Sequence, residues 1–136
     1  MARYTFTPDL VTGNALIDSQ HKELIKAIDD LITACSSGKG SAHLDATLKF
    51  MADYTAKHFG DEEKLQRQYK YPDAINHRKL HEGFKAVVRD LGKQLHDEGP
   101  TLKLVSAVNS NIGGWLVKHI KREDVKVAAH VKANGG

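Results

Sequence analysis

Residues 73–96 read DAINHRKLHEGFKAVVRDLGKQLH. The apolar and histidine positions of this stretch recur every three or four residues, which is the spacing of one face of an α-helix. The positions on this face are His77, His81, Phe84, Val88, Leu91 and Leu95. The stretch therefore predicts an amphipathic helix whose buried face begins with two histidines.

Three further helical segments flank this stretch. Two of them, about 14–35 and 41–69, precede it, and the last begins after Pro100, a residue that suits the first position of a helix. Either Asn14 or Asp18 could cap the first segment. Short connections rich in Gly, Pro and Ser separate the segments, and none of them shows the alternating pattern of a strand. The pattern predicts four helices and no sheet.

Amphipathic helices joined by short connections pack most simply as an antiparallel up-down-up-down bundle. We therefore expect an all-α four-helix bundle with a short N-terminal arm. The length of 136 residues suits one domain, residues 1–136. Within it we expect an arm at 1–13, the bundle at about 14–124 and a C-terminal tail at about 125–136.

Composition narrows the classes of function. The net charge is only +3, and the cationic residues alternate with acidic ones, so we expect no nucleic-acid partner. No apolar run is long enough to cross a bilayer, and the N-terminus lacks the layout of a signal peptide, so we expect a cytoplasmic protein without membrane insertion. The lone Cys35 cannot form an internal disulfide. We expect the chain to be a monomer.

Polar residues interrupt the apolar faces of all four helices. In an antiparallel bundle these interruptions meet at one level: His21, His58, Glu62, His77, His81 and His119. Burying an unpaired polar group costs roughly 1–3 kcal/mol, and an unpaired charge costs more. Metal coordination removes this cost because each lone pair gains a cationic partner. The sequence therefore predicts a buried metal site.

The ligand types indicate which metals fit. Imidazoles with carboxylates favour iron, zinc or copper over magnesium or calcium, and no cysteine constellation favours structural zinc. So many ligands require two metal ions, and Glu62 has two oxygens with which it can bridge a pair. The remaining histidines, His43, His96 and His130, lie near turns or the tail, where we expect solvated side chains.

The ordered motif His58-x3-Glu62, His77-x3-His81 and His119-x4-Asp124, preceded by Ile17-Asp18-Ser19-Gln20-His21, resembles that of the hemerythrin family. The resemblance covers about residues 6–124, and the opening stretch 6–13 is similar to the bacterial branch. Myohemerythrin is itself a known example of this bundle topology.

The resemblance implies a particular ligand set. His77, His81 and His119 would bind one iron, and His21 and His58 would bind the other. Glu62 and Asp124 would bridge the two iron ions together with an oxo or hydroxo group. On an ideal helix, however, Asp124 lies about 140° from His119, whereas Glu123 lies only about 40° away. If Asp124 is a ligand, the helix must end, unwind or bulge between Ile120 and Asp124.

The resemblance also implies reversible binding of molecular oxygen at the iron with an open position, in a carrier, store or delivery protein that is not an enzyme. An apolar pocket would protect the bound oxygen from water. Its expected lining residues are Leu24, Phe59, Trp115, Leu116 and Ile120. An oxygen-consuming enzyme would be a partner.

Other functions share the same bundle. A di-iron oxidoreductase of the ferritin-like kind would carry more carboxylates, in Glu-x-x-His pairs, whereas this chain carries His-x3-Glu and His-x3-His. Slow oxidase, peroxidase or nitric-oxide chemistry and an oxygen or redox sensor stay open as alternatives. A purely structural bundle leaves the aligned histidines unexplained.

Overall fold

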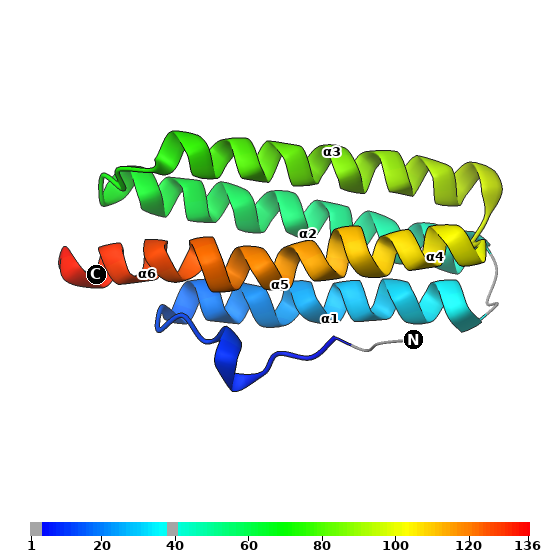
Figure 1. Ribbon diagram of the computed structural model, residues 1–136, viewed down its shortest axis with the longest axis horizontal. Helices are drawn as coiled ribbons and strands as arrows, with labels where there is room; N and C mark the ends of the chain where they lie inside the picture. Colours follow the sequence, from blue (N-terminus) through cyan, green and yellow to red (C-terminus); the bar gives the residue numbers. More distant parts are fainter. Residues whose placement is uncertain (1–3, 38–40) are drawn as a thin grey trace.

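The computed structural model describes residues 4–37 and 41–136, and the side chains of 41–43 lie outside this description. Four rods of helix lie side by side and alternate in direction (Figure 1). The first three are α1 (Ala15–Ser37), α2 (Ser41–Gln68) and α3 (Ala74–Glu98). No strand occurs in the described part of the chain. The structure confirms the all-α four-helix bundle.

The fourth rod is continuous but changes its helical pitch. It consists of α4 (Leu102–Val108), the π-helix η2 (Asn109–Gly114), α5 (Trp115–His119), the π-helix η3 (Ile120–Asp124) and α6 (Val125–Ala133). The residues at the junctions keep right-handed helical torsion angles, so the rod does not break. Before α1, the N-terminal arm contains a short 3₁₀ helix, η1 (Pro8–Leu10), and runs along the outside of the bundle (Figure 1).

Side-chain hydrogen bonds fix where the first helix begins. The Asn14 carboxamide oxygen accepts from the backbone N–H of Ile17 at 3.0 Å, so Asn14 is the cap of α1. Asp18, the other candidate, instead accepts from the backbone N–H and the hydroxyl of Thr12 at 2.8 and 2.7 Å. Asp18 therefore ties the N-terminal arm to the first turn of α1.

The C-terminal tail expected at about 125–136 is mostly helix. α6 continues to Ala133 because Val127, Ala128 and Val131 are buried, at most 4% exposed, against Ile17 of α1. This second apolar cluster extends the bundle beyond the point where the sequence motif ends. Burial of apolar surface is what holds the final helix in place.

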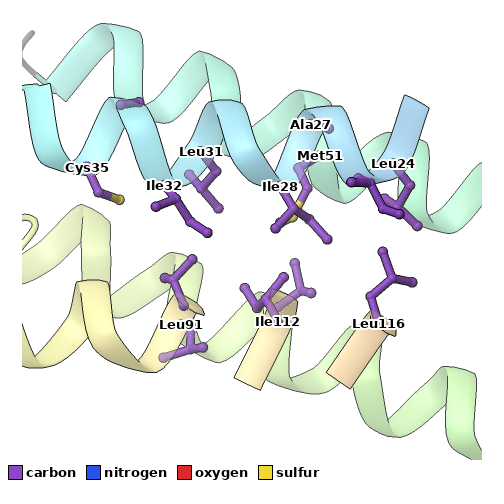
Figure 2. Packing of buried hydrophobic residues seen from close by; sticks show 14 of the residues in the cluster. Leu24, Ala27, Ile28, Leu31, Ile32, Cys35, Met51, Leu91, Ile112 and Leu116 are labelled. Carbon is purple, nitrogen blue, oxygen red and sulfur yellow. The ribbon is translucent and has the colours of Figure 1, made fainter. Parts of the chain in front are cut away.

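The main core fills the bundle on the other side of the polar level. Figure 2 shows its residues pointing toward one another, for example Leu24 of α1 opposite Leu116 of α5, and Ile28 opposite Ile112. Leu24 follows His21 by one turn and Leu116 precedes His119 by one turn. The polar level therefore lies between two apolar layers, the main core and the cluster around Val127.

Candidate metal centre

The structure brings all seven predicted ligand side chains together. Each is buried, at most 5% exposed, and each rod of the bundle contributes at least one of them: His21, His58, Glu62, His77, His81, His119 and Asp124. They form two overlapping groups. Within each group, the ligand atoms all lie within 4.8 Å of one another. One group holds Glu62 and Asp124 with three histidines, and the other holds the same two carboxylates with two.

The two carboxylates lie where the two groups overlap. Glu62 directs Oε1 toward Nε2 of His77 at 2.6 Å, and Oε2 toward Nε2 of His58 at 3.6 Å. Asp124 directs Oδ1 toward Nε2 of His119 at 3.0 Å, and Oδ2 toward Nε2 of His21 at 2.8 Å. Each carboxylate thus presents its two oxygens to different sets of histidines, which is the arrangement that a bridging ligand requires.

Several of these converging atoms make no hydrogen bond of proper geometry with any described residue. They are Nε2 of His58, Nε2 of His81, both oxygens of Glu62 and Oδ1 of Asp124. Buried polar atoms in native proteins nearly always have a partner, so a cluster of such atoms requires an explanation. Metal ions placed between the nitrogen and oxygen atoms supply the missing partners, and the residues fit them.

The π-helix η3 explains how Asp124 reaches the cluster. A π-turn contains one more residue than an α-turn, so residues five apart come to lie on the same side. Asp124 follows His119 by five positions and shares its face, whereas Glu123 is only partly buried and belongs to neither group. The structure thus confirms the bulge that a ligand at position 124 demands.

Charge in the metal-free cluster is distributed unevenly. Burial lowers the pKa of His58 to about 4, despite the opposing charge of Glu62. Burial acts in the same direction on His77, but the carboxylates of Asp124 and Glu62 close to its Nε2 atom outweigh it and raise the pKa of His77 to about 9. Burial favours a neutral Asp124, yet the close imidazoles of His119, His21 and His77 hold its pKa well below the usual value. Without metal, a proton on His77 supplies positive charge beside the two carboxylates, and metal cations would take its place.

Two outer residues to which the sequence analysis gave no role orient the histidines. Gln20, 4% exposed, accepts from Nδ1 of His58 at 2.8 Å and donates to Asp61 at 2.7 Å. Glu63 accepts from Nδ1 of His81 at 2.9 Å. Such contacts fix which ring nitrogen faces the metal. Both residues are sequence neighbours of ligands, but neither lies on the periodic stripe, so periodicity could not single them out.

Comparison with known proteins agrees with this geometry. Residues 12–131 match the family model described as the hemerythrin HHE cation binding domain. The chain belongs to the hemerythrin family. It is 30% identical to a bacteriohemerythrin of Stenotrophomonas maltophilia over 98% of this chain and 85% of the relative. It is 32% identical to a bacteriohemerythrin of Pseudomonas aeruginosa strain LESB58, over 91% of this chain and 78% of the relative.

A third similar protein is the myohemerythrin of Sipunculus nudus, 34% identical over 82% of this chain and 79% of the relative. Hemerythrin domains hold a di-iron centre, and the buried histidines and carboxylates of this chain are compatible with one. Family membership supports a di-iron, oxygen-binding protein. No helix in the described residues is long and apolar enough to cross a membrane.

Of the five residues expected to line an apolar pocket, two aromatic ones contact ligand histidines directly. Leu24, Phe59, Leu116 and Ile120 are at most 1% exposed, while Trp115 is half-buried. The Phe59 ring stacks on His81 at a centroid distance of 3.8 Å. The Trp115 ring stacks on His119 at 4.5 Å. Apolar and aromatic groups thus cover the cluster on the side of the main core.

The three histidines outside the motif differ in their surroundings. His96 is exposed, as expected. The expectation of a solvated His130 is wrong, because its Nε2 atom donates to the Tyr69 carbonyl at 2.7 Å and its ring packs against Tyr71. His130 lies on α6, and this helix brings its ring to Tyr69 and Tyr71. The side chain of His43 lies outside the described residues.

Proposed function

We propose that the protein binds molecular oxygen reversibly at its di-iron centre, as an oxygen carrier, store or delivery protein. One observation supports this most directly: Glu62 and Asp124 each offer two oxygens to two different groups of histidines. A pair of metal ions bridged by carboxylates needs this arrangement, whereas one ion does not. When bound, the di-iron centre supplies reversible electron exchange with oxygen.

We assign the ligands by the two groups. His77, His81 and His119 would hold one iron, His21 and His58 would hold the other, and Glu62 and Asp124 would serve both. The first group contains three histidines and the second contains two. Because a metal with fewer protein ligands keeps a position for an external ligand, the iron held by His21 and His58 would be the one open to oxygen.

The remaining residues hold and shield the centre. Gln20 and Glu63 orient two of the histidines through their outer ring nitrogens. Leu24, Phe59 and Leu116 border the cluster without offering a hydrogen bond, so they limit the entry of water and protons that would end the oxygenated state. No further acid or base is required for a function that only binds and releases oxygen.

The test is reconstitution with ferrous iron under anaerobic conditions, followed by admission and removal of oxygen. We expect two iron ions per chain and a visible absorption band that appears with oxygen and fades when oxygen is removed. Prompt and irreversible oxidation would instead favour the di-iron oxidoreductase. A band that persists unchanged under both conditions would contradict reversible binding.

A further inference from the structure

A buried glutamine lies next to the metal cluster without a partner. Gln66 of α2 is only 1% exposed, and neither its amide nitrogen nor its amide oxygen makes a hydrogen bond with any described residue. Burial of an unpaired amide costs on the order of a hydrogen bond or more, and native proteins rarely leave such a group unpaired. An apolar residue of similar volume would avoid that cost. Gln66 is therefore a candidate for a specific role.

The position of Gln66 relates it to one ligand in particular. It follows Glu62 by four residues on α2, so both side chains lie on the same face, one turn apart. α3 runs antiparallel to α2 (Figure 1), and His81 contacts both Glu62 and Glu63. His77 lies one turn earlier on α3 and therefore faces the turn of α2 that carries Gln66.

Tyr71 lies close to both residues. The backbone N–H of Tyr71 donates to the Gln66 carbonyl at 2.9 Å, and the Tyr71 ring lies 6.3 Å from the His77 ring, measured between centroids. The loop between α2 and α3 thus connects the end of one helix to the first turn of the next. Tyr71 therefore meets Gln66 through its backbone and His77 through its ring.

His77 has the complementary need. Its Nε2 atom points at Glu62 and Asp124, at 2.6 and 3.1 Å, but its buried Nδ1 atom has no hydrogen-bond partner among the described residues. When Nε2 of a histidine binds a metal, Nδ1 carries a proton and becomes a donor. The corresponding atoms of His58 and His81 already have acceptors, Gln20 and Glu63.

We propose that Gln66 is the positioning residue for His77, its amide oxygen accepting the Nδ1 proton of that imidazole directly or through one enclosed water. The bond holds the His77 ring with Nε2 toward the metal. It also pairs two buried groups, Nδ1 of His77 and the Gln66 amide oxygen, that otherwise lack a partner. This inference depends on His77 being a metal ligand, as in the proposed function, but not on oxygen binding.

The test compares three variants of the full chain loaded with ferrous iron under anaerobic conditions. Gln66→Met keeps the approximate volume of the side chain and removes the acceptor. Gln66→Glu keeps an acceptor oxygen. Gln68→Met makes the first substitution at the exposed last residue of α2 and serves as the matched control. Proton NMR then follows the exchangeable Nδ1 protons of the five ligand histidines, and a chelator assay measures iron release.

In the wild-type protein we expect the His77 proton, assigned by its proximity to the Tyr71 ring, to exchange as slowly as those of His58 and His81. In Gln66→Met this proton alone should exchange faster, and iron should be released roughly 10–100-fold faster, the range for loss of an outer-shell partner. Gln66→Glu should restore slow exchange at least in part, and Gln68→Met should match the wild type.

Two results would overturn the inference. One is a His77 proton that is unprotected in the wild type, a measurement that does not require any variant to fold. The other is Gln66→Met protein in which the His77 proton is unchanged or a different histidine, such as His21, responds. Neither result would contradict the assignment of a di-iron centre. Wild-type protein that takes up no iron would instead overturn that assignment.

Discussion

His119 and Asp124 are five residues apart in sequence, yet Nε2 of the first lies 3.0 Å from Oδ1 of the second. In an α-helix these side chains would point in widely different directions. The π-helix between Ile120 and Asp124 turns them to the same side. π-Turns of this kind occur often at functional sites, and this one delivers a carboxylate that joins both groups of ligands.

The first prediction tests this relationship. Asp124→Ala removes the carboxylate that faces His21, His77 and His119, so iron affinity should fall by more than the roughly 10–100-fold typical of an outer-shell residue. Glu123→Ala removes the neighbouring carboxylate, which lies in neither ligand group, and should leave the iron content unchanged. Metal analysis after dialysis measures both. Equal losses in the two variants would contradict the role of the π-turn.

The second prediction concerns His77. His77→Ala should lower the iron content and loosen the bundle, because Glu62 loses its shortest contact and His81 is left poorly supported. His96→Ala removes an exposed histidine from the same helix and is the control. Iron stoichiometry and thermal unfolding of the loaded proteins provide the measurements. Unchanged stoichiometry in His77→Ala would count against its assignment as a ligand.

A third prediction addresses the apolar layer next to the ligands, which Leu116 enters one turn before His119. Leu116→Thr places a hydroxyl in the core next to the ligands, where Leu116 is only 1% exposed and faces Leu24 (Figure 2). Easier access of water and protons should shorten the lifetime of the oxygenated protein. Leu102→Thr, at a residue 86% exposed, should leave that lifetime unchanged. The decay of the visible band in air measures it, and equal lifetimes would remove the argument for a dry pocket.

The fourth prediction is a pH dependence of the metal-free protein. The pKa of His58 is lowered to about 4 from an ordinary value of 6.5, so between these values the unfolded chain binds more protons than the folded one. Stability should therefore fall as the pH is lowered from 6.5 to 4, by about 3 kcal/mol from this residue alone. The contribution is fully present above pH 6.5.

Urea unfolding at several pH values measures this loss. His58→Gln removes the titrating group and keeps a polar side chain beside Gln20, so its stability should depend less on pH over the same interval. The buried carboxylates act mainly at lower pH, because the pKa values of Asp124 and Glu62 are lowered from ordinary values of 3.8 and 4.5 and their contributions are lost only below those values. Parallel curves for the wild type and the variant would contradict the prediction.

Sequence periodicity was sufficient for the helices but not for every ligand. His21, His58, Glu62, His77, His81 and His119 each lie on an apolar stripe, so spacing alone placed them in the core. Asp124 does not lie on such a stripe, because its position depends on a π-turn that the spacing of apolar residues does not predict. Only the resemblance to the hemerythrin motif identified it.

The residues around the ligands depended still more on the fold. Gln20 and Gln66 are polar residues that would be placed on the surface by composition, yet both are buried, and Gln20 bonds His58. Whether a polar side chain finds a buried partner depends on which helix packs against it, and that information is not local. The same holds for α6, which forms because Ile17, far away in sequence, supplies the surface that covers Val127 and Val131.

By itself, then, the sequence determined four amphipathic helices, their antiparallel order and a layer of histidines at one level, since these follow from spacing and short connections. The tertiary structure decided which oxygen of each carboxylate faces which histidine, where the fourth rod widens into π-turns, and which outer residues hold the imidazoles. The two kinds of information differ in their distance along the chain. Helix formation depends on neighbours within one or two turns, whereas coordination geometry depends on atoms brought together from all four rods.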